Sequence, residues 1–151
     1  MGAPAPLGGT TSSTREVCDA RLPAISHAAI TVSDLAVSTR WYTALIGSDP
    51  VLDEDEGKGA YHHTVWSLPG GQLFGIHTHQ DAGGSFFDES SVGLDHLAFG
   101  CATRADLGHW ASRLDEMGIP HSGIDDQHYG SGVSFRDPDG TALEFFAPPG
   151  S

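Results

Sequence analysis

Positively charged residues are scarce in this chain. Its 151 residues include 7 Lys+Arg against 20 Asp+Glu, which gives a formal net charge of −13. Such a surface repels phosphate backbones and anionic lipids, so we expect neither nucleic acid nor a membrane as a partner. No apolar run approaches the roughly 20 residues that a membrane-spanning helix needs.

Cysteine and the common cofactor motifs are also scarce. The two cysteines, Cys18 and Cys101, lack metal-ligand spacing, and a disulfide framework is not expected. Phosphate-loop, dinucleotide-binding, HExxH, GxSxG and paired CxxC patterns are absent. Residues 1–22 are rich in Gly, Pro, Ala, Ser and Thr, without the charged and apolar regions of a secretory signal. We therefore expect a disordered tail at 1–22 and a cytoplasmic protein.

What the sequence does contain is an internal repeat. When the chain is shifted along itself so that His27 meets His96, two tryptophans and two Pro-x-Gly turns also superimpose, without a gap. The further pairs at this offset are Trp41 with Trp110, Leu45 with Leu114, Pro69 with Pro138, and Gly71 with Gly140. This pattern indicates two copies of one supersecondary unit, at about 24–80 and 93–148 of a single domain at 23–151.

Each copy is predicted to form a strand, a helix and about three further strands. The opening strands are expected at 25–32 and 94–101, where apolar and β-branched residues dominate. Ser33 or Asp34 and Thr103 are the candidate N-caps of the two helices. The Pro-Gly sequences predict a hairpin turn near the end of each copy.

Helical periodicity predicts which side chains face the core. The first helix is expected to bury Val37, Trp41, Ala44 and Leu45, and the second Leu107, Trp110, Leu114 and Met117. The acidic run at 53–57 between helix and hairpin is interpreted as a solvated loop.

Strand alternation separates the apolar side chains from three that can bind metals. Leu97, Phe99 and Cys101 share the face that should pack under a helix, so His96 points to the opposite face. His27 has the equivalent place in the first copy. Glu144 alternates with apolar neighbours in the last strand, and we expect it to face the same cavity.

A cation would explain why a glutamate is tolerated in an apolar strand. Two neutral imidazoles and one carboxylate form a ligand set that suits first-row divalent metals. The metal would neutralise Glu144 and remove the cost of burying it unpaired. The alternative is that each of these residues is an ordinary core or rim residue.

The same residues resemble a known family. The stretches "HAAITVSDL…WYTALIG", "GLDHLAF" and "FRDPDGTALEFF" look like the vicinal oxygen chelate superfamily of glyoxalases, fosfomycin- and bleomycin-resistance proteins and extradiol dioxygenases. The resemblance covers about 24–148. It implies an α+β fold in which two tandem βαβββ modules form an incomplete barrel around a metal.

The resemblance also implies a ligand set and a partner. The family's metal ligands match His27, His96 and Glu144, with one divalent ion, Fe(II), Mn, Ni, Co or Zn, as cofactor. Many members carry a fourth ligand where this chain has Gly75, and His77, one pleat along, is a candidate replacement. Small members often form homodimers that share each site between two chains, so a dimer is expected.

The implied function is metal-dependent catalysis on a small metabolite with vicinal oxygens, of the isomerase, lyase or dioxygenase type. Glu144, His77 or Tyr129 could shuttle the proton, as could His63 or His79, although these two are interpreted as solvent-exposed. Arg136 could contact an anionic group or form a salt bridge. The alternative is a binding or antibiotic-resistance protein that uses the same cleft without turnover.

Overall fold

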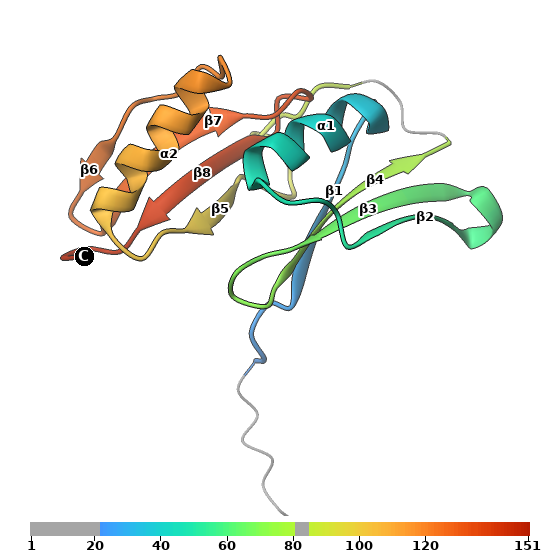
Figure 1. Cartoon of the computed structure of the whole chain (residues 1–151), viewed down its shortest axis with the longest axis horizontal. Coiled ribbons are helices and arrows are strands. Elements are labelled where there is room, and N and C mark those ends of the chain that lie inside the picture. The colour runs from blue at the N-terminus through green and yellow to red at the C-terminus, as the bar shows by residue number, and fades with distance from the viewer. Residues whose placement is uncertain (1–21, 81–84) are drawn as a thin grey trace, which may run out of the picture.

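The computed structural model describes residues 22–80 and 85–151, so the tail expected at 1–22 lies, apart from Leu22, outside the described residues. The first module contains β1 (His27–Thr31), α1 (Leu35–Ile46), β2 (Leu52–Glu56), the 3-10 turn η1 (Gly57–Gly59), β3 (Tyr61–Ser67) and β4 (Leu73–His79). The second contains β5 (Leu97–Gly100), α2 (Arg104–Glu116), β6 (Asp125–Gln127), β7 (Gly130–Arg136) and β8 (Ala142–Ala147) (Figure 1).

Each module folds into one four-stranded sheet. The first sheet has the order β1-β4-β3-β2 and the second β5-β8-β7-β6, and in both the first strand runs parallel to the last. The register repeats with the sequence offset, since Ala29 pairs with Gly75 and Ala98 with Glu144. The α+β fold of two βαβββ modules is confirmed, and its two open sheets agree with an incomplete barrel.

The two helices cover one face of the sheets and leave the other open. Helix α2 lies across β7 and β8, and α1 packs against β4 (Figure 1). Asp34 caps α1 through the backbone N–H of Val37, and Thr103 forms a capping box with Asp106 at α2. No helix in the described ranges is long and apolar enough to cross a membrane.

The buried stripe of α1 differs from the expected one. Ser38, Tyr42 and Leu45 are buried, whereas Val37 is 40% exposed. Tyr42 is tolerated in the core because its hydroxyl donates a hydrogen bond to Asp137 at 2.8 Å. The stripe of α2 agrees with expectation: Leu107 and Leu114 are buried, and Trp110 stacks on Phe145 with ring centroids 4.3 Å apart.

The expected loop at 53–57 is wrong over most of its length. Residues Leu52–Glu56 form strand β2, which pairs antiparallel with β3. Acidic composition disfavours strands, but here each acidic residue stands opposite a residue of β3, and two of the β3 residues are histidines. Charge pairing across the ladder replaces the apolar pattern from which strands are usually recognised.

Side chains from both modules meet at the loop that precedes β8. Asp137, which is 6% exposed, accepts the hydrogen bond from Tyr42 of α1, and burial raises the pKa of Asp137. The Asp139 carboxylate accepts hydrogen bonds from the backbone N–H and the hydroxyl of Ser33. On the core side, Phe74 of the first sheet contacts Phe99 of the second, with ring centroids 5.8 Å apart. The two modules therefore share one continuous core.

Candidate metal site on the open sheet faces

The second sheet brings two of the expected ligands together on its open face. His96 Nε2 lies 3.7 Å from Glu144 Oε2, and His96 Nδ1 lies 2.6 Å from Asp95 Oδ1. A hydrogen bond from Nδ1–H to Asp95 leaves the Nε2 lone pair free and turned toward Glu144. The gap between His96 and Glu144 is too long for a hydrogen bond. It suits two ligands of one metal, each about 2.0–2.2 Å from the ion.

Gly132 makes room for the Glu144 carboxylate. Residue 132 is on β7, the strand that pairs directly with β8, and a Cβ atom there would overlap Glu144 Oε1. Since Glu144 and His96 side chains are 24% and 50% exposed, the pair is reachable from solvent while the carboxylate is partly enclosed. The glycine therefore sets where the carboxylate lies.

A cleft of about 890 Å³ opens beside this pair. Tyr129, 61% exposed, lines it together with His96 and Glu144. His121 also lines it, with a side chain that is 13% exposed, contacts Asp115 and accepts a hydrogen bond from the Gly123 N–H. Arg136 forms a salt bridge with Glu89, with Nη2 and Oε1 2.5 Å apart, at the same cleft. The volume lies in the range of small-molecule sites.

The first sheet carries the other expected ligands on its own open face. His27 and His77 share a face with Gly75, because Ala29 pairs with Gly75 and Thr31 with His77. His77 Nε2 lies 3.6 Å from the place where a Cβ of residue 75 would be. The imidazole of His77 thus lies over the position at which the side chain is missing. Burial first, and then the neighbouring His63, His79 and His27, lower the pKa of His77 and keep it neutral.

One chain alone does not assemble the expected ligand set. His27 and His77 belong to the first sheet, and His96 and Glu144 are associated with the second. In the described parts of the chain, the one group of three ligand atoms within 4.8 Å of one another is formed by Glu54, Glu56 and His63. The convergence of His27, His96 and Glu144 stays a prediction.

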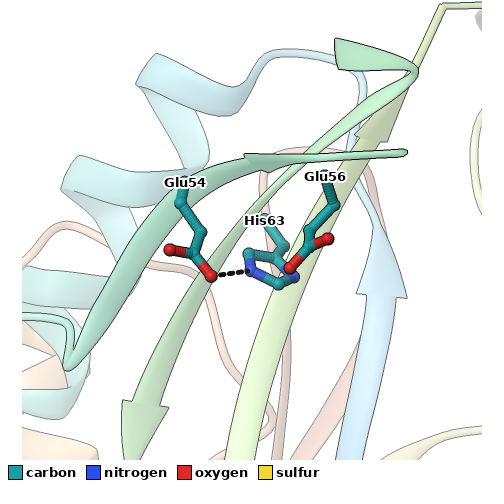
Figure 2. Close-up of side chains that lie close together, drawn as sticks. All are labelled: Glu54, Glu56 and His63. Carbon is teal, nitrogen blue, oxygen red and sulfur yellow. Dashed lines mark ion pairs between the residues drawn. The ribbon is translucent and has the colours of Figure 1, made fainter. Parts of the chain in front are cut away.

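The Glu54–Glu56–His63 group was missed by sequence reasoning. Figure 2 shows the two carboxylates of β2 reaching toward the His63 ring on β3. His63 was interpreted as exposed, but its side chain is 14% exposed, whereas the expected exposure of His79 is correct. The available signal was the acidic run "DEDE" followed by the two histidines of β3. If the run is taken as a strand, alternate acidic residues share a face with one of those histidines.

Comparisons with known proteins agree with this architecture. A family model described as the Glyoxalase/Bleomycin resistance protein/Dioxygenase superfamily matches residues 24–145. A solved glyoxylase/bleomycin resistance protein/dioxygenase domain from Frankia sp. EAN1pec is 31% identical, with 85% of this chain and 99% of that chain covered and a TM-score of 0.77. No curated protein matches the chain.

Two more distant structures share the fold. A glyoxalase family protein from Enterococcus faecalis is 24% identical, with 82% of this chain and 96% of that chain covered and a TM-score of 0.66. A mutant of the fosfomycin resistance protein FosX from Listeria monocytogenes, complexed with Mn(II) and 1S,2S-dihydroxypropylphosphonic acid, is 16% identical. It has 83% of this chain and 93% of that chain covered and a TM-score of 0.62.

Proposed function

We propose that this chain, which belongs to the Glyoxalase/Bleomycin resistance protein/Dioxygenase superfamily, is a metal-dependent enzyme acting on a small metabolite with two neighbouring oxygens. The reaction is of the isomerase, lyase or dioxygenase type. His27, His96 and Glu144 would hold one first-row divalent cation, and His77 would be a fourth ligand.

The observation that carries this proposal is the His96–Glu144 pair. Its nitrogen and oxygen stand 3.7 Å apart without a hydrogen bond, and Asp95 orients the imidazole from behind. A histidine backed by a carboxylate is the usual arrangement at metal sites in proteins. Gly132 removes the Cβ that would push Glu144 away. The mixed nitrogen and oxygen donors suit Mn, Fe, Co, Ni or Zn, and the FosX relative was solved with Mn(II).

His77 supports the fourth position. The family pattern has a ligand at the position occupied here by Gly75, and the His77 ring lies over that glycine. Its lowered pKa keeps the imidazole neutral near neutral pH, which is the form that binds metals. The imidazole of His77, two residues after Gly75 on β4, would thus replace the carboxylate that is missing at position 75.

Dimerisation would complete the site. The open face of the first sheet, with His27 and His77, would face the second sheet of a partner copy, with His96 and Glu144. Leu52 and Leu73, on the same face as His27, are 38% and 40% exposed, which a partner would cover. Each chain has one pair of ligands on its first sheet and the other pair on its second sheet. In a symmetric dimer, the first sheet of either chain would face the second sheet of its partner, which would give two equivalent sites.

The protein's own groups then divide the chemistry. A bound cation would supply Lewis acidity toward the two substrate oxygens. Neutral His77 could accept a proton from the substrate, and the Tyr129 hydroxyl at the cleft could donate one, with proton exchange through solvent restoring both groups. Arg136 would attract an anionic substituent, in exchange for its salt bridge with Glu89. The cleft walls would limit the size of the substrate.

Metal content of single variants and of their mixture tests this proposal. His27→Ala and Glu144→Ala should each lose the bound cation from this site, because each removes one of its ligands. A mixture of the two, unfolded and refolded together, should regain part of it. A heterodimer of the two variants has one site with both defects and one intact site. Elemental analysis after dialysis gives the metal per chain, and His109→Ala, on the exposed side of α2, is the matched control.

Each result has a clear meaning. Full metal in both single variants would contradict the ligand assignment. Loss in both without recovery in the mixture would show that each site lies within one chain. Recovery would also justify a screen of metal-loaded protein against 1,2-diols, hydroxyketones and catechols. Absence of turnover in that screen would argue against a catalytic function.

A non-catalytic binding protein is the second candidate. The cleft of about 890 Å³ is large enough for a drug-sized molecule. Trp66 and Phe74 do not line this cleft, because both are buried in the core, and Phe86, which is 82% exposed, is not among its lining residues either. A metal-free protein that still binds an aromatic compound at this cleft would favour the binding role.

A further inference from the structure

We propose that Glu54, Glu56 and His63 bind a second divalent cation, at a site separate from the His27–His96–Glu144 set. The group lies on the hairpin of β2 and β3 (Figure 2). Its three donors are not among the ligands assigned above, although His63 pairs with His77 on the same sheet face and the two ring centroids are 5.3 Å apart. One imidazole nitrogen and two carboxylates favour Zn²⁺ or a neighbouring first-row cation over Ca²⁺ and Mg²⁺, which prefer oxygen alone.

The strand register brings the three side chains to one face. Glu54 stands directly opposite His63 in the antiparallel ladder. Glu56 stands opposite Tyr61, and Tyr61 comes two residues before His63 on β3. Residues directly opposite and two apart along a strand point to the same side of a sheet. Backbone pairing therefore holds the donors in place without help from a loop.

The separations of the donor atoms fit a coordination sphere. All three ligand atoms lie within 4.8 Å of one another, and His63 Nε2 is 3.5 Å from Glu54 Oε1. That gap exceeds a good hydrogen bond. Ligands about 2.0–2.1 Å from a tetrahedral zinc ion stand roughly 3.3–3.5 Å apart, which is the gap found here. The remaining coordination positions would be left to water or to a small ligand.

An unpaired nitrogen points to a missing partner. His63 Nε2 is buried and forms no hydrogen bond, although the ring as a whole is 14% exposed. Buried polar atoms in folded proteins almost always have a partner, and an orphan one indicates an ion or water at that place. The nearest carboxylate, on Glu54, is 50% exposed, so a cation could enter from solvent and reach the nitrogen.

The opposite face of the same hairpin shows what a satisfied group looks like. His62 contacts Asp53 through Nε2 at 2.6 Å and Asp55 through Nδ1 at 2.9 Å. Both ring nitrogens are used, so each of the two carboxylates has a hydrogen-bond partner on His62. His63, whose buried nitrogen has no hydrogen bond, leaves Glu54 and Glu56 without an equivalent partner, and a metal cation would supply one.

Zinc titration of carboxylate variants tests this site. Full-length protein is stripped of metal and titrated with Zn²⁺ by calorimetry, with elemental analysis of the dialysed product. Glu54→Gln/Glu56→Gln should lose one bound equivalent per chain relative to the parent, because amides are weak zinc ligands. Asp49→Asn/Glu116→Gln removes the same charge from exposed positions with no hydrogen bond in the described structure, and should bind like the parent. His63→Gln should repeat the loss without changing the charge.

The result is distinguishable from failure of the proposed function. Loss in the Glu54/Glu56 variant, together with full retention of that equivalent in Glu144→Ala, supports a separate site, even if the parent binds only this one cation. Unchanged zinc binding in both the Glu54/Glu56 and the His63 variants overturns it. Equal loss in the charge-matched control overturns it too, since the effect would then be general electrostatics.

Discussion

The two sheets share a backbone and differ in what their open faces carry. Under the offset that superimposes His27 on His96, the pair His63–His77 of the first sheet becomes Gly132–Phe146 of the second, and both are direct partners in their ladders. Gly75 becomes Glu144. In each sheet a glycine lies beneath a reaching side chain: His77 over Gly75, and Glu144 against Gly132. The duplicated fold thus supplies equivalent positions, and the two sheets place a glycine and a donor side chain at different ones of them.

Substitutions in the core test how equivalent the two modules are, and they should give the largest changes in stability. Phe74 and Leu143 occupy equivalent positions and are each 1% exposed. Phe74→Ala should lower the free energy of unfolding by about 3–5 kcal/mol and Leu143→Ala by about 2–5 kcal/mol, because both leave cavities in one shared core. Urea unfolding monitored by circular dichroism measures both. Val92→Ala, at a fully exposed position, should change stability by less than about 0.5 kcal/mol.

A large difference between the two core variants would break the comparison. If Leu143→Ala cost less than about 1 kcal/mol while Phe74→Ala cost several, the second module would tolerate a cavity that the first does not. Two separate unfolding transitions would show that the modules do not unfold as one unit, despite the contact between Phe74 and Phe99.

The shared architecture was readable from the sequence because it repeats. The ungapped offset, the Pro-Gly turns and the N-caps at Asp34 and Thr103 each act locally, and the structure follows them. The shared face of His96 and Glu144 was predictable because strand alternation opposes both to buried neighbours, and His96 Nε2 lies 3.7 Å from Glu144 Oε2. Their role as metal ligands stays a prediction.

What could not be read depends on contacts between distant segments. The rotation of the α1 stripe follows from the bond between Tyr42 and Asp137, which are far apart in the sequence. The strand at 52–56 follows from the charge pairing of Asp53, Asp55 and their neighbours with histidines, which no propensity scale records. The arrangement of His27 relative to His96 depends on a second chain under the proposal, and the sequence points to that chain only through its family resemblance.

The two glycines offer a sharper, intermediate test. Gly132→Ala should weaken metal binding at the proposed site about 10–100-fold, because the new Cβ displaces the Glu144 carboxylate, the end of a flexible side chain, and leaves the backbone in place. Gly75→Ala places its Cβ at ordinary contact distances of 3.5–3.7 Å from its neighbours, so metal binding should change little. Calorimetric titration with Mn²⁺ compares the two variants.

Circular dichroism and thermal unfolding of both glycine variants provide the control. Gly75→Ala should be as stable as the parent or up to about 1 kcal/mol more stable, because alanine costs less backbone entropy in a strand. A Gly132→Ala protein that keeps both its fold and its full metal affinity would show that the Glu144 carboxylate is not a ligand.

The smallest effect is expected at the outer face of the β2–β3 hairpin, where His62 contacts Asp53 and Asp55. Hydrogen bonds to Asp53 and then Asp55 raise the pKa of His62 above its ordinary 6.5, and the bond to His62 lowers the pKa of Asp53 below 3.8. The stabilisation by His62 is therefore full below about pH 6.5 and is lost as the pH rises through the raised value. The contribution of Asp53 is present above pH 3.8 and is lost as the pH falls through its lowered value.

His62→Gln should remove this window. Because His62 is partly exposed and its carboxylate partners are exposed, the loss should be below about 1 kcal/mol near pH 5 and should vanish at alkaline pH, where the parent's imidazole is neutral. Melting temperatures of parent and variant between pH 4 and 9 measure it, with His109→Gln as a control on an exposed helix position. A difference that grows with rising pH would contradict the assignment. It would mean that His62 stabilises the hairpin as a neutral ring. A protonated His62 would then no longer distinguish its face of the hairpin from the face that carries His63.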